Sequence, residues 1–176
     1  MVWVVIAIGV SVVIGLPIVV WLWGSRLPKS HSVEKSVTVL LPPAAVWVIV
    51  TDFTLEPKWN SSIKSSERLP DQNGHEVWRV VDRTGGKLPL ETLESVPGKR
   101  LIRRIADTKL PYGGVWTITL APDESGIRVS VREDGEVYNP FFRFISHFFM
   151  KKDATISRYL AGLVEYVKGR ASERTT

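Results

Sequence analysis

The sequence contains no cysteine and only three histidines. The lack of cysteine excludes disulfide bonds, thiolate zinc sites and cysteine nucleophiles. The histidines, His31, His75 and His147, are far apart, and no carboxylates are grouped with them. The segment from His75 to Arg79 begins like a zinc-binding His-Glu-x-x-His motif but has arginine where the second histidine is required. We therefore predict no metal and no cofactor.

Other functional motifs are also missing. The Gly86–Lys87 pair lacks the earlier glycine and the Ser or Thr of a phosphate-binding loop, and no Gly-x-Ser-x-Gly nucleophile elbow occurs. The net charge is +5, but the basic residues are spread along the chain, so we predict no nucleic-acid partner. The 176 residues, 44% hydrophobic and 23% charged, suit one folded domain with a short appendage.

Charge is absent from the amino-terminal segment up to Arg26. This apolar run is long enough to cross a hydrocarbon core of about 30 Å as a helix. Trp3 stands near one end and Trp21 and Trp23 near the other, where indole rings favour the membrane interface. A cleaved signal peptide is the alternative, but the run is too long and no small-x-small cleavage site follows it. We predict a transmembrane anchor at residues 1–23 and a polar linker at residues 24–30.

The basic residues near this segment all follow it. Arg26, Lys29 and Lys35 come after the apolar run, and neither Lys nor Arg precedes it. By the positive-inside rule, this asymmetry predicts a single-pass membrane protein whose remaining domain lies on the cytoplasmic side.

The remaining chain divides into a domain at residues 31–170 and a tail at residues 171–176. Alternating apolar and polar letters from His31 predict a strand, which Pro42 and Pro43 end. Two small helices are then expected, in PPAAVWVIVTD and LEPKWNSSI. Six further strands are predicted, separated by turns rich in Gly, Pro, Asn and Asp: SIKSSERLP, HEVWRVVDR, KLPLETLESV, KRLIRRIAD, GVWTITLAP and IRVSVREDGEVY.

A long closing helix is predicted after these strands. Asn139 is a suitable N-cap and Pro140 suits the first helical position. An apolar stripe runs from Phe141 to Val167, and Lys152 with Asp153 marks a bend between two helical parts. We interpret the aromatic run FFRFISHFF as the underside of this helix packed on the sheet, with a ligand-facing wall as a compatible alternative.

The segments PPAAVWVIVTDFTLEPKWN, ESVPGKRLIRRIAD, LPYGGVWTITLAP, GIRVSVREDGEVYNP and YLAGLVEYV, in this order, resemble the SRPBCC superfamily, the START-like proteins often labelled polyketide cyclase/dehydrase. The resemblance covers roughly residues 31–169. It implies an α+β helix-grip fold, in which a curved antiparallel sheet wraps a long carboxy-terminal helix around an apolar cavity. The superfamily includes lipid carriers, aromatases and cyclases, ubiquinone-binding proteins and chaperone activators, so the resemblance is specific for fold and poorly specific for activity.

The predicted function is therefore a membrane-tethered domain that binds a hydrophobic small molecule or lipid without catalysis. Glu133 shares its strand parity with apolar residues and is the one weak catalytic candidate, as an acid or base with a raised pKa. Alternatively it returns to water or pairs with Arg103 or Arg104. An enzyme of the cyclase or dehydratase type using this carboxylate and a regulator that binds a protein partner remain open. The residues predicted to line the cavity are Trp59, Trp78, Trp116, Ile118, Leu120, Val129, Val131, Phe144 and Phe148.

Overall fold

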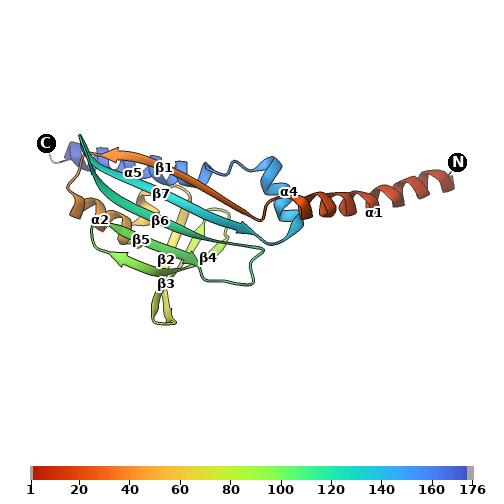
Figure 1. The fold of residues 1–176 in the computed structure, drawn as a ribbon, viewed down its shortest axis with the longest axis horizontal. Helices are drawn as coiled ribbons and strands as arrows, with labels where there is room; N and C mark the ends of the chain where they lie inside the picture. Colours follow the sequence, from red (N-terminus) through yellow and green to blue (C-terminus); the bar gives the residue numbers. More distant parts are fainter. Residues whose placement is uncertain (1, 174–176) are drawn as a thin grey trace.

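The computed structural model describes the backbone of residues 2–173 and the side chains of residues 3, 13 and 15–170. Seven strands and five helices follow one another within these residues (Figure 1). Their bounds are α1 Val2–Arg26, β1 Ser30–Val39, α2 Pro43–Thr51, α3 Glu56–Trp59, β2 Ile63–Gln72, β3 His75–Asp82, β4 Lys87–Val96, β5 Arg100–Ile105, β6 Tyr112–Asp123, β7 Gly126–Val137, α4 Pro140–Phe149 and α5 Ala154–Glu173.

The strands form one antiparallel sheet in the order β1-β7-β6-β5-β4-β3-β2. Strands β2 to β7 are neighbours in sequence and in space, whereas β1 joins the far edge beside β7. The helices α2 and α3 therefore carry the chain from one edge of the sheet to the other. Tight turns join the strands: Asn73 and Gly74, between β2 and β3, both have positive φ angles, as a type I′ hairpin turn requires. The predicted order of strands and helices is confirmed.

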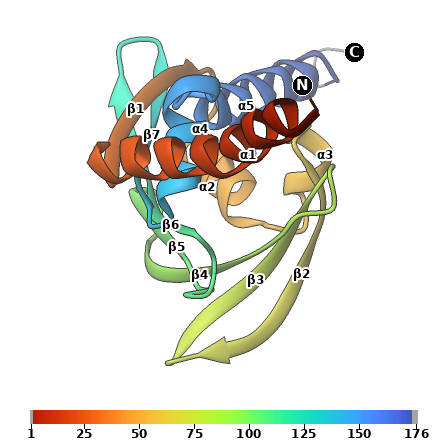
Figure 2. The same cartoon turned by 90° about the vertical axis from the view of Figure 1, so that its right-hand side faces the viewer.

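The helix α5 lies across the inner face of the curved sheet, along β1 and β7 (Figures 1 and 2). The helix α2 contacts β6, and α3 lies against both β2 and α5. Apolar side chains of α5 and of the inner strand faces form the core, in which Leu163, Val129 and Val131 are fully buried. This is the helix-grip arrangement expected from the resemblance.

The closing helix is divided into two. Helix α4 ends at Phe149 and α5 begins at Ala154, so the predicted bend at Lys152 and Asp153 is confirmed. The predicted start is also confirmed, because the Asn139 side chain accepts hydrogen bonds from the backbone N–H groups of Phe141 and Phe142. The interpretation of the aromatic run as the underside of the gripping helix is wrong, since α4 packs mainly on α1 and touches the sheet at β7, whereas α5 lies along the sheet.

The amino-terminal helix α1 projects away from the sheet (Figure 1). Among the residues that the structure describes, no helix is both long and apolar enough to span a membrane. Residue 1 and the side chains of residues 2, 4–12 and 14 lie outside that description, and so does much of the predicted anchor at residues 1–23. The predicted linker, residues 24–30, begins as the last turn of α1. In the predicted tail, residues 171–176, α5 continues to Glu173, and residues 174–176 lie outside the described part.

Candidate functional site

One row of side chains crosses the inner face of the sheet and brings polar groups into the interior. Thr92 of β4 pairs in register with Arg103 of β5, which pairs with Trp116 of β6, which pairs with Glu133 of β7. Residues directly opposite each other on antiparallel strands point to the same face. The row therefore places a guanidinium, an indole and a carboxylate side by side above α5.

Arg103 is the central group of this row and is only 7% exposed. Its guanidinium carbon lies 3.7 Å from the centre of the Phe53 ring, a cation–π contact. Its Nη1 is 3.9 Å from the Glu56 carboxylate, which reaches it from α3. Among the described residues, Nε and Nη2 of Arg103 have no hydrogen-bond partner. A buried arginine normally has most of its donors occupied, so this one retains unused binding capacity.

Burial shifts the pKa of both Arg103 and Glu56 toward their neutral forms. Burial raises the pKa of the Glu56 carboxyl, while the charge of Arg103 and a hydrogen bond from the Asn60 amide offset part of the rise. Burial also lowers the pKa of Arg103, with Glu56 acting in the opposite direction. Each charge is therefore tolerated in the interior largely because the other is present.

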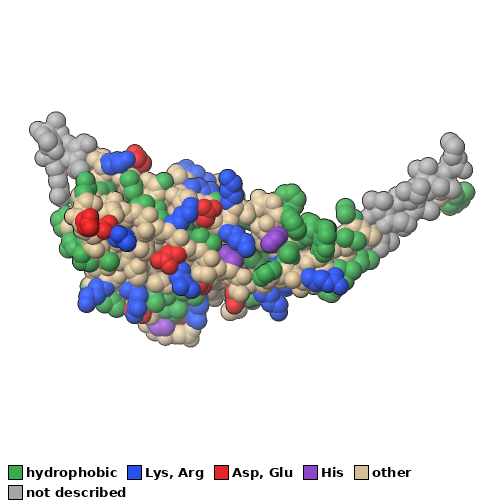
Figure 3. All heavy atoms as spheres, turned by 45° about the horizontal axis from the view of Figure 1, so that its top comes forward, with side chains coloured by type: hydrophobic (Ala, Val, Ile, Leu, Met, Phe, Trp, Pro, Cys, Tyr) green, Lys and Arg blue, Asp and Glu red, His purple; other side chains and the backbone are tan. Residues whose placement is uncertain are grey.

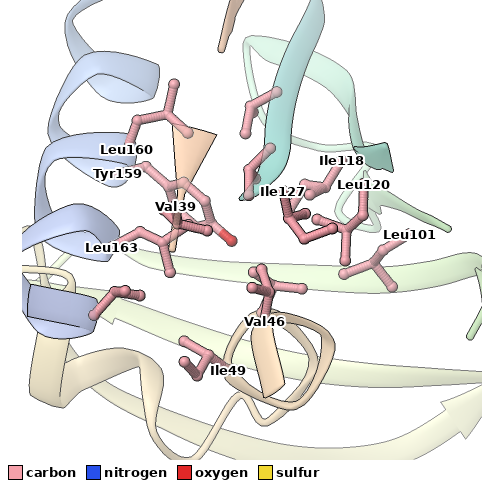
Figure 4. Close-up of a cluster of buried hydrophobic side chains, with 14 of the residues drawn as sticks. Val39, Val46, Ile49, Leu101, Ile118, Leu120, Ile127, Tyr159, Leu160 and Leu163 are labelled. Atoms are coloured by element: carbon pink, nitrogen blue, oxygen red, sulfur yellow. The ribbon is translucent and has the colours of Figure 1, made fainter. Parts of the chain in front are cut away.

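Aromatic rings surround this pair. Phe53 meets Trp78 edge-on with ring centres 5.5 Å apart, and Tyr159 of α5 meets Trp59 at 4.9 Å and Trp116 at 5.6 Å. Figure 4 shows the Tyr159 hydroxyl directed away from α5 toward the strands. Burial raises the pKa of this hydroxyl, with a further contribution from Glu56, so the phenol stays protonated and can donate. The Trp59 indole N–H has no partner among the described residues.

Glu133 lies at the β7 end of the row, and its predicted inward parity is confirmed by Val129 and Val131, which are fully buried on the same face. Its Oε1 is 3.7 Å from Nε2 of His31, and its Oε2 is buried without a partner in the described structure. Burial raises the pKa of Glu133, and the neighbouring His31 and Trp116 offset part of the rise.

The expected alternative partners of Glu133 are engaged elsewhere. Arg103 faces Glu56, and Arg104 donates to Glu91 at 2.6 Å on the opposite face of the sheet. That second cluster also contains His75, whose Nδ1 is 2.8 Å from Glu91, and these two partners hold the pKa of Glu91 below its usual value. Glu133 therefore stays an inward, incompletely paired carboxylate.

The predicted cavity residues separate into two groups. Trp59, Ile118, Leu120, Val129 and Val131 belong to the buried core, with Trp78 and Trp116 packed against it. Phe144 and Phe148 lie instead on α4, where their rings are 6.2 and 6.3 Å from that of Trp23 of α1. Because α4 packs on α1, these two side chains lie outside the interior of the sheet. Whether the first group lines a ligand stays a prediction.

Two hollows open at the ends of the sheet. One, of about 630 Å³, lies between the start of α2 and the β4–β5 and β6–β7 turns, and Leu120 and Ile127 form part of its wall. The other, of about 900 Å³, lies where β1 begins and β7 ends, close to α1 and α4, and His31 lines it. His31 thus connects this second hollow with Glu133 and the inner row.

The sequence contained a signal for only part of this site. Arg103 alternates with Leu101 and Ile105 in RLIRRI, so its strand parity, like that of Glu133, places it on an apolar face. Tyr159 lies on the predicted apolar stripe of the closing helix and is buried as that stripe implies. Glu56 gave no such signal, and the approach of both residues to Arg103 depends on where α3 and α5 pack. In the described residues, no three His, Asp or Glu side chains are grouped closely enough to hold a metal ion.

Comparisons with known proteins agree with this architecture. A family model described as "Polyketide cyclase / dehydrase and lipid transport" matches residues 30–167. No curated protein matches the chain. Similar solved structures include the di-domain ARO/CYC StfQ of the steffimycin biosynthetic pathway, at 11% identity and a TM-score of 0.63 over 82% of this chain, which spans about half (52%) of that protein.

Two further solved structures are similar over nearly their whole length. A START superfamily protein from Mycobacterium smegmatis has 19% identity and a TM-score of 0.61, covering 79% of this chain and 98% of its own. The Zhui aromatase/cyclase from Streptomyces sp. R1128 has 17% identity and a TM-score of 0.61, covering 84% of this chain and 96% of its own. At these identities the similarity establishes a shared fold.

Proposed function

The chain belongs to the polyketide cyclase / dehydrase and lipid transport family, and from that premise we propose that it binds a hydrophobic small molecule or lipid between the sheet and α5 without catalysing its conversion. The ligand is mainly apolar and has one anionic or strongly accepting group, which Arg103 receives. The observation that carries this proposal is the pair of unoccupied Arg103 nitrogens in the aromatic interior.

The unoccupied donors support a ligand role for energetic reasons. A buried donor without a partner costs about 1 to 3 kcal/mol, and a charged one costs more. A planar guanidinium with two free N–H positions matches a carboxylate or phosphate oxygen pair. Binding such a group would recover this cost at Arg103. The surrounding rings of Phe53, Trp59 and Trp116 would hold the apolar part by removing it from water, at about 25 cal/mol per Å² of surface.

The first experiment tests this assignment directly. The full chain is purified, its bound lipids and small molecules are extracted with organic solvent, and the extract is identified by mass spectrometry. The variant to compare is Arg103→Met with Glu56→Gln, which removes both buried charges together. The control is Arg132→Met, which removes an exposed arginine on β7.

We expect the double variant to fold and to lose the extracted molecule, while Arg132→Met retains it. Circular dichroism and a cooperative urea transition establish that each variant is folded. A folded double variant that carries as much of the same molecule as the wild type would contradict the role of Arg103. An empty wild-type protein that also fails to bind fatty acids or phospholipids would contradict the whole proposal.

The helix α1 is proposed to tether this domain to a membrane, with the domain on the cytoplasmic side. The supporting observations are the absence of charge before Arg26, the single helix from Val2 to Arg26, and the basic residues Arg26 and Lys29 that follow the apolar run. A reporter fused after Thr176 should be active only if it functions in the cytoplasm. Activity of an export-dependent reporter would reverse the orientation.

An enzyme is the second candidate, and Glu133 is the observation in its favour. A carboxyl with a raised pKa, one unpaired oxygen and a histidine at 3.7 Å has the features of a general acid or base. Glu133→Gln keeps the size of the side chain and removes the titrating proton. If carriage is correct, this variant binds the extracted molecule within a few fold of the wild type. If it binds the molecule unchanged and accumulates it in place of a product that the wild type forms, the enzyme assignment replaces carriage.

A further inference from the structure

A patch of exposed apolar side chains lies where α1 meets the rest of the protein. We call it the junction patch. Phe149 is 76% exposed, Met150 is 62% exposed, and Trp23 of α1 is 58% exposed. Figure 3 shows hydrophobic side chains gathered at this junction. The members of the patch are Trp21, Leu22, Trp23, Phe141, Phe142, Ile145, Phe148, Phe149 and Met150.

The two helices of the junction patch form one continuous surface. The Trp23 ring lies 6.2 Å from that of Phe144 and 6.3 Å from that of Phe148, so α1 and α4 meet through their aromatic side chains. Soluble monomers rarely expose a contiguous apolar patch larger than a few hundred Å². A surface with this many large rings therefore requires an apolar occupant.

Buried polar contacts fix the patch in place. Arg143 of α4 is only 5% exposed, and its Nη1 donates to the carbonyl oxygens of Gly24 at 3.2 Å and Leu27 at 3.3 Å at the end of α1. Its Nη2 donates to the Tyr138 carbonyl at 2.9 Å. The exposed aromatic side chains thus lie on a helix whose position relative to α1 is set by hydrogen bonds.

The orientation of α4 suits a bilayer surface. In both ribbon views α4 runs across α1 close to the point where α1 enters the domain (Figures 1 and 2). With α1 crossing the bilayer, a helix that crosses it at this end lies along the membrane interface. Interfacial helices have this composition, with large apolar and aromatic side chains on one side and basic residues beside them.

Basic side chains flank the junction patch. Lys151 and Lys152 follow α4, Arg26 is the last residue of α1 and Lys29 follows it, and all four are exposed. The nearby carboxylate of Asp153 pairs with Lys35 at 2.5 Å; Lys35 holds the pKa of Asp153 below its usual value, and Lys151 makes a smaller contribution. Basic residues beside a membrane-inserted helix attract anionic headgroups. The charge and the apolar surface therefore point to the same partner.

We propose that α4 is an interfacial helix whose apolar side chains enter the headgroup and acyl boundary of an anionic leaflet. This inference rests on the proposed tether, because it places α4 at the level where α1 leaves the bilayer. It adds a second membrane contact, which fixes the orientation of the domain. The hollow lined by Ser30, His31 and Tyr138 then lies at the membrane end of the sheet.

The experiment uses the absence of cysteine in the chain. Single cysteines are introduced into the full chain as Phe149→Cys, Ile18→Cys or Leu40→Cys, and each is given a nitroxide spin label. The proteins are reconstituted into vesicles of phosphatidylcholine and phosphatidylglycerol. Collision rates with oxygen, which concentrates in lipid, and with a water-soluble nickel chelate are measured for each label. Ile18 reports on α1, and exposed Leu40, beyond the far end of β1, is the aqueous control.

We expect the labels at positions 149 and 18 to favour oxygen and the label at position 40 to favour the nickel chelate. Phe142→Cys serves as a second position in the junction patch and should behave like Phe149→Cys. A lipid-exposed label at 18 with aqueous labels at 149 and 142 overturns the interfacial helix and leaves the tether standing. An aqueous label at 18 with lipid-exposed labels at 149 and 142 overturns the tether and the position that it gives α4, and supports the lipid contact of the junction patch alone.

Two remaining outcomes also decide the inference. Aqueous labels at positions 18, 149 and 142 overturn both proposals. Labels at 149 and 142 that are shielded from both relaxing agents and show dipolar broadening between molecules indicate that a second copy of the chain covers the junction patch. That result overturns the assignment of a lipid partner.

Discussion

The contact between α5 and α3 gives the sharpest test of the packing that positions the inner site. Gly162 of α5 faces the backbone of α3, and a Cβ atom placed on it would overlap the carbonyl oxygen of Trp59. The same atom would lie 3.3 Å from the Trp59 carbonyl carbon and 3.6 Å from the Asn60 Cα atom. Because these are backbone atoms, no side-chain rotation relieves the overlap. In Gly162→Ala one of the two helices must move.

The magnitude follows from two opposing effects. Replacing glycine by alanine inside a helix favours folding by about 1 kcal/mol. Forcing an extra carbon into a packed contact costs about 1 to 3 kcal/mol. Gly169 of the same helix is the matched control, since a Cβ there meets nothing within 4 Å. Gly169→Ala therefore receives only the favourable effect, and the two variants should differ in unfolding free energy by about 1 to 3 kcal/mol.

Urea unfolding of the full chain in mild detergent, followed by tryptophan fluorescence, measures this difference. We expect Gly169→Ala to unfold at the same or higher urea than the wild type, and Gly162→Ala at a lower concentration than Gly169→Ala with a similar slope. The displaced α3 contains Glu56, so Gly162→Ala should also weaken ligand retention. Equal midpoints for the two alanine variants would show that the backbones of α3 and α5 do not meet as described.

Three further predictions concern charges and the helix junction. Arg103→Met alone should lower the unfolding free energy by about 3 to 5 kcal/mol, because it leaves Glu56 buried and unpaired. The double change with Glu56→Gln should be neutral or stabilising. Equal losses of unfolding free energy for the single and double variants in urea titrations would refute this. Burial raises the pKa of Glu133 above its ordinary 4.5, so the folded state disfavours the carboxylate and its contribution to stability falls as the pH rises through the folded-state pKa. The urea midpoint of Glu133→Gln should therefore rise relative to that of the wild type as the pH is raised above 4.5. A difference between the two midpoints that does not change with pH would contradict the raised pKa. Gly24→Ala places a Cβ against a backbone carbonyl of α4, so trypsin should cleave the α1–β1 connection faster in this variant. The control is Gly15→Ala, whose added Cβ meets no atom within 4 Å. Equal cleavage rates in the two variants would exclude a tight junction.

The strands and the start of α4 were predictable because their signals are local. Alternation in GIRVSVRE places Val129, Val131 and Glu133 on one face, and the structure has them there. Asn139 followed by proline predicted a capped helix, and the cap forms. A strand period or a cap depends on neighbouring residues, so the sequence contains the necessary information.

The arrangement of α4 and the Arg103–Glu56 pair were not predictable in the same way. An apolar helix stripe shows that a helix face is covered, and it does not show which element covers it. The FFRFISHFF stripe therefore suited the sheet as well as it suits α1. Glu56 lies on a helix of only four residues, and its approach to Arg103 depends on where that helix packs between β2 and α5. Such contacts are set by tertiary packing.

The two buried arginines show how the role of such a residue follows from its hydrogen bonds. Arg143 and Arg103 are almost equally buried, at 5% and 7% exposure. Arg143 gives both terminal nitrogens to backbone carbonyls, which stay in place whatever side chains change, and only its Nε lacks a partner in the described structure. Within the part of the chain that the structure describes, Arg103 donates to no backbone carbonyl. Its neighbours are a carboxylate at 3.9 Å and the face of the Phe53 ring, and two of its nitrogens have no partner there.

This difference distinguishes the structural role of Arg143 from the ligand-binding role that we propose for Arg103. Replacing Arg143 leaves several carbonyl oxygens at the α1–α4 junction without a donor, and no second substitution can remove a backbone carbonyl. Replacing Arg103 leaves one carboxylate, which Glu56→Gln neutralises. A stabilising role for Arg103 would have favoured closer contacts to fixed acceptors, as at Arg143. The charge is instead held in place with two buried donors that have no partner among the described residues, and we propose that an anionic ligand group completes them.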